Sequence, residues 1–300
     1  MKCLTTNGCT QFAYVVPEVP KIVHWSNEVP TTCVLGGAQS HRSPAQIRTL
    51  WQPKECPNVR LQENILGTQY VNASFIHGID DNLTVIAAQG PTIETVPHFL
   101  QMICENSIHF VIMLTNPKEK NSRTGETLEK CAKYWSSGGA EQTKMKHFKV
   151  SAHAKKEIAP HVVQRECLIN GLDRKHTFTH IQFEDWPDFG APDSAELLVD
   201  CAKEIRQLIP RTRKSTMLVH CSAGVGRTGT FVGLYKLMND IDDQMPTLDV
   251  YSTVLAMRRD RMCMVQREVQ YKYLYECTEW YLRQKDGSGD HYEPDYIYTQ

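Results

Sequence analysis

The most informative part of the sequence is the run His220-Cys221-Ser222-Ala223-Gly224-Val225-Gly226-Arg227-Thr228-Gly229. It follows a short apolar segment, residues 216–219, and precedes a segment with apolar residues at helical spacing. The first pattern predicts a buried strand and the second predicts an amphipathic helix. We therefore expect the run to connect a strand to a helix.

Three glycines within six residues of this run, Gly224, Gly226 and Gly229, allow the backbone to curl so that its amides point into one concavity. Such a nest at the start of a helix attracts an anion. Cys221 adds a nucleophile, and the planar guanidinium of Arg227 adds a two-pronged anion clamp. The run is therefore suited to attack on a phosphate. The alternative is a buried structural thiol in a glycine turn.

The composition is that of an ordinary folded domain. Of the 300 residues, 41% are apolar and 22% are charged, and 33 Lys and Arg face 34 Asp and Glu for a net charge of -1. This balance gives no overall attraction to DNA or to a membrane surface. No segment approaches the 18 or so apolar residues of a membrane span, and the N-terminus lacks the apolar core of a signal peptide.

The 11 cysteines are scattered without a C-x-x-C pair, which argues against a zinc site or a thioredoxin-like motif. They fit a reducing compartment, so we expect a cytoplasmic protein with mostly buried thiols. His176 and His180 are four residues apart, but the alternation over residues 177–183 predicts a strand, along which four residues span roughly 13 Å. We therefore expect no metal and no other cofactor.

Prolines, glycines and composition divide the chain into three parts. We expect an irregular N-terminal extension over residues 1–45, one domain over 46–284 and a flexible tail over 285–300. Strands are predicted over residues 69–77, 84–88, 109–114, 144–152, 165–170, 177–183 and 216–219. Helices are predicted over residues 95–104, 194–209, 247–258 and 269–283 and after the signature run, and residues 118–130 are predicted to be a charged loop. This order indicates an α/β fold with a mixed sheet.

The run from His220 to Gly229 matches H-C-x-x-G-x-x-R-[ST]-G without departure and so resembles the signature of the protein tyrosine phosphatases. The resemblance implies a single domain with a twisted mixed sheet flanked by helices. It also implies that Cys221 becomes a phosphocysteine, that Arg227 holds the phosphate oxygens and that Thr228 stabilises the departing thiolate. The phosphate would bind over Ser222, Ala223, Gly224, Val225 and Gly226. We expect His220 to bond to backbone near Cys221 rather than to act as a base.

A second segment, Trp186-Pro187-Asp188-Phe189-Gly190, resembles the mobile acid loop of this family. It lies 33 residues before Cys221, directly after an alternating strand; in isolation it would indicate only a surface turn. The resemblance makes Asp188 the general acid toward the tyrosyl oxygen and then the base toward water. Trp186 would anchor the hinge of the loop.

A third segment, residues 264–271, resembles the glutamine loop of the family. Gln266 would orient the water that attacks the phosphocysteine, and Gln270 is the second glutamine; a helix-capping glutamine is the alternative. Arg258 and Arg261 match structural arginines of the family and are expected to brace the signature loop. Architectural matches continue at residues 70–76, 88–91 and 130–135, so the resemblance covers roughly residues 50 to 283.

Substrate recognition departs from the family pattern. Cys56 stands where the K-N-R-Y loop of the family has the tyrosine that stacks on the phosphotyrosine ring. A thiol cannot supply that aromatic area, so either Trp51 substitutes or the pocket is shallower. The family also has a glutamate that contacts the signature arginine, here Arg227, and its candidates are Glu126 and Glu129.

Three hypotheses follow. The first is an active phosphatase for phosphotyrosine in proteins, with phosphotyrosine-containing proteins as its partners. The second is a phosphotyrosine-binding module without turnover. The third keeps the chemistry but changes the substrate to phosphoinositides or RNA 5′ phosphates, because Cys56 replaces the stacking tyrosine. We expect a monomer. The compact form also resembles small stand-alone phosphatases, including those carried by polydnaviruses.

Overall fold

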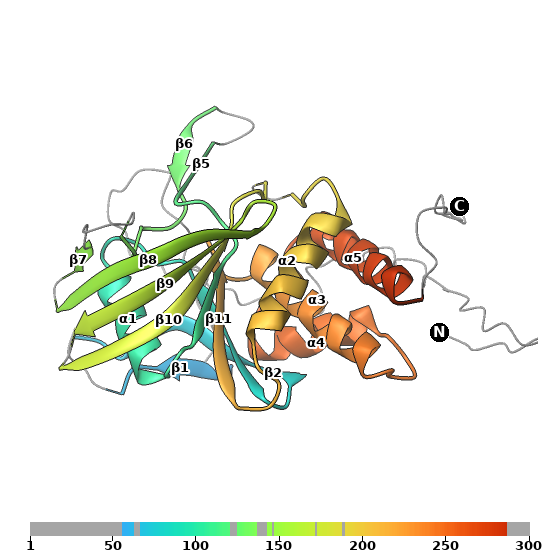
Figure 1. Cartoon of the computed structure of the whole chain (residues 1–300), viewed down its shortest axis with the longest axis horizontal. Coiled ribbons are helices and arrows are strands. Elements are labelled where there is room, and N and C mark those ends of the chain that lie inside the picture. Colours follow the sequence, from blue (N-terminus) through green and yellow to red (C-terminus); the bar gives the residue numbers. More distant parts are fainter. Residues whose placement is uncertain are drawn as a thin grey trace, which may run out of the picture.

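The computed structural model describes residues 56–62, 67–120, 125–136, 143–145, 147–171, 173–187 and 190–286. This part of the chain forms a nine-stranded mixed sheet with helices on both faces, and a separate two-stranded hairpin (Figure 1). The predicted α/β class is confirmed. The predicted N-terminal extension and nearly all of the predicted tail lie outside the described residues.

The parallel strands lie in the middle of the sheet. Strands β3, β11, β4 and β10 pair in parallel, and the outer strands pair antiparallel. The strands, in sheet order, are β1 (Asn58–Arg60), β2 (Tyr70–Asp80), β3 (Leu83–Gln89), β11 (Ser215–Cys221), β4 (Phe110–Met113), β10 (Arg174–Phe183), β9 (Val162–Gly171), β8 (Phe148–Ala159) and β7 (Thr143–Met145).

Strand β4 is apolar throughout, and β3 and β11 are apolar over most of their length, because both faces of the middle of the sheet are covered. In β3, Val85 and Ala87 belong to the core under four helices, whereas Ile86 and Ala88 belong to the core under one helix. The four helices are α2 (Ala195–Leu208), α3 (Gly226–Asp242), α4 (Val250–Asp260) and α5 (Glu268–Asp286), and α1 (Val96–Glu105) covers the opposite face (Figure 1). All five predicted helices are confirmed.

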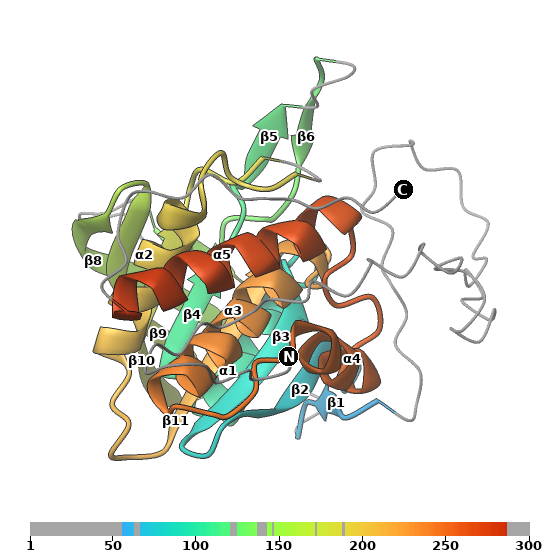
Figure 2. The same ribbon diagram turned by 90° about the vertical axis from the view of Figure 1, so that its right-hand side faces the viewer.

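The segment predicted as a charged loop is instead a hairpin. Strands β5 (Lys118–Lys120) and β6 (Thr127–Glu129) pair antiparallel and project from the body of the domain (Figure 2). Both strands are short and mostly exposed, so they lack the apolar alternation by which a half-buried strand is predicted. The loop prediction was therefore wrong.

Two strand boundaries also differ from the prediction. The strand predicted over residues 144–152 is two strands, because β7 and β8 pair antiparallel with Met145 opposite Phe148. No glycine, proline, asparagine or aspartate marks that reversal. Strand β2 runs past Gly78 to Asp80, and Gly78 adopts a positive φ of 69° at an irregularity in its pairing with β3.

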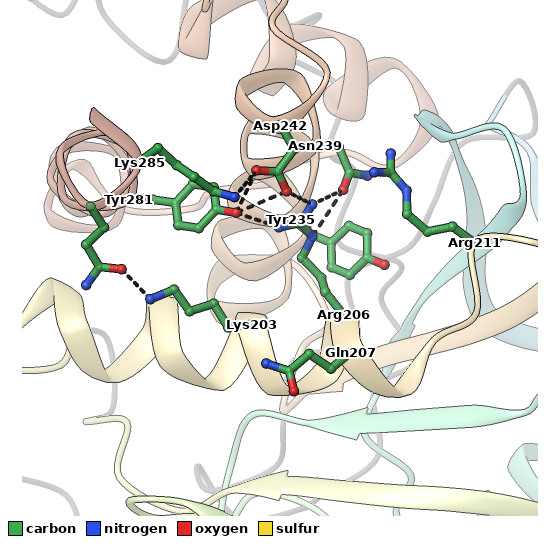
Figure 3. A pocket seen from close by; sticks show the side chains of 10 residues that line it. Lys203, Arg206, Gln207, Arg211, Tyr235, Asn239, Asp242, Tyr281 and Lys285 are labelled. Carbon is green, nitrogen blue, oxygen red and sulfur yellow. Dashed lines mark hydrogen bonds and ion pairs between the residues drawn. The ribbon is translucent and has the colours of Figure 1, made fainter. Parts of the chain in front are cut away.

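A polar network joins three helices on the side of the molecule shown in Figure 3. Arg206 of α2 donates to Asp242 at 2.6 Å and to Asn239 at 2.8 and 3.1 Å, both on α3, and to the Tyr281 hydroxyl of α5 at 3.1 Å. Lys285 also lies 2.8 Å from Asp242. Burial raises the pKa of Asp242, but the hydrogen bonds from Lys285 and Arg206 outweigh it and leave that pKa below its usual value. The network lines a cavity of about 470 Å³.

Candidate active site

The signature loop lies at the carboxyl edge of the parallel strands. Strand β11 ends at Cys221 and α3 begins at Gly226, so the predicted strand, loop and helix are confirmed. The amide of Gly90, after the neighbouring strand β3, donates to the Ser222 carbonyl at 3.0 Å. Loops at this edge of an open α/β sheet are the usual place for a ligand.

The loop curls around the sulfur of Cys221. The Cys221 side chain is buried, at 5% exposure, and the Gly224 amide donates to its Sγ at 3.3 Å. Gly224 has a φ of 73°, and a Cβ built on it would lie 2.1 Å from the Ala88 carbonyl oxygen. Only glycine fits both requirements. The tight curl predicted from the glycine spacing is therefore present, and it brings the Gly224 amide to the Cys221 thiol.

Arg261 holds the outer side of the loop. Its guanidinium donates to the carbonyls of Gly224 at 2.7 Å and Ala223 at 3.2 Å. It also donates to Asn72 at 2.9 Å and Ser74 at 3.3 Å, both on β2. The side chain is fully buried, and burial lowers the pKa of this guanidinium to about 10. Arg261 therefore ties the signature loop to the edge of the sheet.

Arg258 is bonded to the glutamine loop. It donates to the carbonyls of Met264 and Val265, each at 2.8 Å. The Val265 amide in turn donates to the Val225 carbonyl at 3.0 Å. Arg258 thus supports the glutamine loop, which in turn contacts the signature loop, and its role as a brace of the signature loop remains a prediction.

Arg227 is oriented by a glutamate that the sequence did not single out. Glu119 of β5 accepts from its two terminal nitrogens at 2.6 and 2.9 Å, and the Leu114 carbonyl accepts at 3.2 Å. Burial raises the pKa of Glu119, but the hydrogen bonds and charge of Arg227 outweigh it and hold that pKa below its usual value. The side chains of Arg227 and Glu119 are 5% and 9% exposed, so this is a buried bidentate pair.

The prediction that Glu126 or Glu129 contacts Arg227 was therefore wrong, because Glu119 holds that position. Glu129 lies 4.0 Å from Lys118 across the hairpin, and both side chains are about two-thirds exposed. Glu126 is exposed just before β6. The hairpin places Glu119 at its base, where Thr115 also donates to it at 2.7 Å. Glu119 was missed because its pairing with Arg227 depends on the β5/β6 hairpin, and these residues were predicted to be a loop.

The acid-loop segment begins at the end of β10. Trp186 is buried and its indole N–H donates to the Gly190 carbonyl at 3.1 Å. Its ring meets Phe183 and Tyr273 edge to face, with centroids 6.0 and 6.3 Å away. The predicted acid Asp188 lies outside the described residues. The tryptophan thus fixes one side of this segment against the core.

The base of the β5/β6 hairpin is bonded to the same segment. Asn116 donates to the Glu184 carbonyl at 2.8 Å and accepts from Gln182 at 3.3 Å. A second cavity of about 370 Å³ lies between the two. It is lined on one side by Asn116 and residues 118–120, and on the other by residues 184–187, Pro192 and Asp193. The residue that orients Arg227 and the segment that carries Asp188 therefore share one cleft.

The two glutamines of the third segment differ in burial. Gln266 is exposed, whereas Gln270 is 3% exposed and accepts from the Arg267 amide at 3.2 Å. A Cβ at Gly226 would lie 3.0 Å from Gln270 Oε1, so Gln270 packs against the start of α3. Val265 has a φ of 57°, which is rare for a β-branched residue and reverses the chain just before Gln266.

Thr228 has a buried hydroxyl with no hydrogen-bond partner among the described residues. It stands one residue after Arg227 in the first turn of α3. A buried hydroxyl without a partner costs free energy unless a ligand or water supplies one. The Thr228 hydroxyl is therefore available to a bound ligand, a water molecule or a reacting group at the signature loop.

His220 is enclosed by neutral partners. Its Nδ1 lies 3.1 Å from the Cys221 carbonyl and its Nε2 lies 2.7 Å from the Tyr134 hydroxyl. Burial lowers the pKa of His220 to about 4, so it is neutral near pH 7. The expected bond to backbone beside Cys221 is present. The sequence did not reveal Tyr134 as its second partner, although Tyr134 lies in the K-C-A-K-Y-W match.

The other two histidines of interest point to separate partners. His176 Nε2 lies 2.6 Å from the Ile108 carbonyl, and His180 Nε2 lies 3.0 Å from the Tyr134 hydroxyl. Across the described residues, no group of three or more His, Cys, Asp or Glu side chains is placed to hold a metal ion. Both histidines therefore serve the packing of β10.

The Cys56 side chain is buried rather than exposed for contact with a substrate ring. Its side chain is 8% exposed, and its Sγ lies 3.9 Å from the Arg259 carbonyl near the end of α4. Trp51, the proposed substitute, lies outside the described residues. In the described part of the chain, no helix has the length and apolar character needed to span a membrane.

Comparison with known proteins agrees with this geometry. The chain is 34% identical to human receptor-type tyrosine-protein phosphatase C over 217 residues, which is 72% of this chain and 16% of the relative. It is 34% identical to human receptor-type tyrosine-protein phosphatase eta over 244 residues, or 79% of this chain and 17% of the relative. The chain thus spans about a sixth of the length of these relatives.

Solved structures agree as well. The crystal structure of the catalytic domain of human protein tyrosine phosphatase non-receptor type 18 has a TM-score of 0.67 at 27% identity, covering 75% of this chain and 80% of that one. PTPN18 in complex with HER2-pY1196 phosphopeptides has a TM-score of 0.68 at 26% identity, covering 76% and 77%. Residues 48–280 match the protein-tyrosine phosphatase family. The chain belongs to the protein-tyrosine phosphatase family.

Proposed function

We propose that this protein hydrolyses phosphotyrosine in proteins through a phosphocysteine intermediate on Cys221. The observation that carries the proposal is the signature loop itself. It holds the Cys221 sulfur 3.3 Å from the Gly224 amide, and the neighbouring Arg227 is held by two hydrogen bonds to Glu119. These are the parts that covalent phosphoryl transfer requires: a placed nucleophile and oriented anion donors.

In the first step, the Cys221 sulfur attacks phosphorus and the bond from phosphorus to the tyrosyl oxygen breaks. The loop amides of residues 222–226 and the Arg227 guanidinium bind the equatorial phosphate oxygens. Because tyrosine would otherwise leave as a phenolate, Asp188 donates a proton to the departing oxygen. The buried Trp186 supports this role because it anchors the segment that carries Asp188.

In the second step, water attacks phosphorus, the sulfur–phosphorus bond breaks and inorganic phosphate leaves. Gln266 orients this water and Asp188 accepts its proton. Thr228 donates a hydrogen bond to the departing thiolate, a role supported by its buried hydroxyl without a partner among the described residues. Neutral His220 takes no part as a base and supports the loop through its bond to the Cys221 carbonyl.

The partners proposed are phosphotyrosine-containing proteins. The complex of PTPN18 with phosphopeptides supports this substrate class for a domain of the same fold. We further propose that the protein acts as a monomer in cytoplasmic signalling, and it needs no cofactor for the chemistry above. The likeness to the small polydnavirus type remains a prediction from the sequence.

The test is turnover by the purified protein of p-nitrophenyl phosphate and of a phosphotyrosine peptide. We expect both to be hydrolysed, and Cys221→Ser to lower kcat by at least about 10³-fold. Cys104→Ser is the matched control, because Cys104 is a half-buried free thiol on α1. Wild-type protein that binds phosphopeptides without turnover would instead support the binding-module hypothesis.

A second variant tests the acid. Asp188→Ala should bind a phosphotyrosine peptide with nearly unchanged affinity while kcat falls by about 10²- to 10⁴-fold. The same variant should retain phosphotyrosine proteins from a cell lysate. Rapid turnover by Asp188→Ala would contradict the assigned role, and faster hydrolysis of phosphoinositides or RNA 5′ phosphates than of peptides would contradict the substrate class.

A further inference from the structure

The mouth of the signature loop lacks the aromatic side chain that Cys56 replaces. The Cys56 thiol is directed to the Arg259 carbonyl at 3.9 Å and is almost fully buried. It therefore offers a bound phosphotyrosyl ring neither aromatic area nor much surface of any kind. A ring contact on this side of the mouth has to come from another residue.

Strand β2 presents its residues alternately to two surroundings. Val71, Ala73 and Phe75 pack with the core that contains α1. The residues between them, Asn72 and Ser74, face the other way and accept hydrogen bonds from Arg261. Tyr70 lies two residues before Asn72. The pairing of β2 with β1 is irregular between Ser74 and Tyr70, but the charge of Arg261 acts on the Tyr70 hydroxyl, which places Tyr70 on the same side as Asn72 and Ser74.

The start of β2 lies at the same edge of the sheet as Cys221. Ala73 is paired with Ala88 of β3, and Gln89 of β3 is paired with Cys221. Asn72 closes this corner by donating to the Gln89 side chain at 3.1 Å. Because β2 is antiparallel to β3, its first residue, Tyr70, lies at the edge of the sheet where the signature loop begins.

Arg261 is the neighbour that Tyr70 shares with the signature loop. Partial burial raises the pKa of the Tyr70 hydroxyl, and the positive charge of Arg261 opposes that shift. The same guanidinium donates to the carbonyls of Ala223 and Gly224. Tyr70, Asn72 and Ser74 thus form one row along β2 beside the arginine that braces the loop.

Tyr70 combines a fixed backbone with an available ring. Its amide donates to Thr68 Oγ1 at 3.0 Å, and it is paired with Arg60 of β1. Its side chain is 45% exposed. Of the large aromatic residues in the described part of the chain, only Tyr70 and Tyr251 are exposed, and Tyr251 lies near the start of α4. Arg261 follows that helix, about 15 Å further along its axis.

We propose that Tyr70 is a specificity-determining residue of this site, whose ring contacts the phosphotyrosyl ring of the substrate in place of the tyrosine that Cys56 replaces. The inference rests on the proposed phosphatase function and names the residue that selects aryl phosphates. Tyrosine suits the role, because a ring with two rotatable bonds gives a large contact at little cost in conformational entropy.

The test compares KM for p-nitrophenyl phosphate with the inhibition constant of inorganic phosphate. Tyr70→Ala should raise KM by about 2- to 12-fold, the range expected for one aromatic contact, with kcat changed less than about twofold. Tyr70→Phe should keep the wild-type KM, because the ring is retained. Inhibition by inorganic phosphate should be the same in all variants, because phosphate has no ring and measures the anion nest alone.

A further variant sharpens the test. Tyr251→Ala removes a tyrosine that is also exposed, at 54%, but lies near the start of α4, and it should leave KM unchanged. An unchanged KM in Tyr70→Ala overturns the inference, as does an increase accompanied by equally weakened phosphate inhibition. Wild-type protein without turnover would instead overturn the proposed function.

Discussion

Two arginine networks in this protein use the same chemistry for different ends. Around the signature loop, Arg227 is paired with Glu119 while Arg261 donates to loop carbonyls. In the helical layer, Arg206 is paired with Asp242 and surrounded by side chains from three helices (Figure 3). The first network connects helix, hairpin and strand residues to a backbone loop, and the second connects helices to one another.

The difference lies in what remains for a ligand. In the helical network, the Asp242 carboxylate accepts from Arg206, Tyr281 and Lys285, so the charges are satisfied internally. In the signature loop, Arg261 takes up loop carbonyls, which leaves the amide side of the curl facing Cys221. The helical network therefore closes on itself around Asp242, whereas Arg261 uses its donors on the carbonyls of the loop beside Cys221.

Removing Arg261 should have the largest effect. Arg261→Met leaves the Gly224 and Ala223 carbonyls and two side chains of β2 without their buried donor. We expect the free energy of unfolding to fall by about 3–5 kcal/mol and kcat to fall with it. Urea denaturation measures the first and p-nitrophenyl phosphate turnover the second. Stability and turnover both close to wild type would show that the loop holds its shape without this brace.

Breaking the Arg227–Glu119 pair should affect turnover more than folding. Glu119→Gln keeps a hydrogen-bond acceptor but removes the charge and the bidentate geometry. We expect kcat/KM to fall by about 10- to 100-fold, or about 1.4–2.7 kcal/mol of transition-state stabilisation. Glu129→Gln, on the same hairpin but exposed, is the control and should be neutral. Equal effects of the two substitutions would refute the assigned role of Glu119.

Removing Arg206 should affect folding more than turnover. Arg206→Met deletes the donor to Asp242, Asn239 and Tyr281, so the free energy of unfolding should fall by about 1.5–3 kcal/mol. The kinetic constants should stay within about twofold of wild type, because the pairs in this network are closed among the helices. Thermal unfolding and steady-state kinetics measure the two effects. A large loss of kcat without a loss of stability would erase the distinction between the networks.

The smallest expected effect is on pH dependence. The pKa of His220 is about 4 in the folded protein and about 6.5 in an unfolded chain, so the unfolded state binds the proton first as pH falls. Stability should therefore decrease through that window, by about 1 kcal/mol between pH 7 and pH 5.5. The pKa of three carboxyl groups is also lowered, those of Glu119, Asp242 and Asp249, and they act in the same direction but at lower pH.

Urea denaturation of His220→Asn at these two pH values isolates this contribution. The variant should be less stable than wild type at pH 7 but should show a shallower decrease toward pH 5.5. His153→Asn, which replaces an exposed histidine of β8, should keep the wild-type slope. The same slope in His220→Asn and wild type would mean that His220 is not the group responsible.

Most of the secondary structure followed from local patterns in the sequence. The helices and central strands were predictable because apolar spacing reports directly on the face that each element buries. The signature loop was predictable for a different reason, since its cysteine, glycines and arginine lie within ten consecutive residues. The failures include β1, which no predicted strand covers, the β5/β6 hairpin and the β7/β8 reversal, where short or exposed strands or an unmarked turn carry no such pattern.

The sequence alone revealed features that depend on neighbouring residues, whereas contacts between distant residues became known only from the fold. The proposed nucleophile Cys221, the proposed phosphate ligand Arg227 and the curl at Gly224 could be predicted from ten consecutive residues, because the chemistry of a loop depends on neighbours along the backbone. The partner of Arg227 could not be predicted in this way, since Glu119 lies 108 residues away and reaches Arg227 only when the hairpin folds at the edge of the sheet. The same holds for Cys56, whose burial against Arg259, 203 residues later, turns it from the mouth. Side-chain partners at such separations are set by packing, which no local pattern encodes.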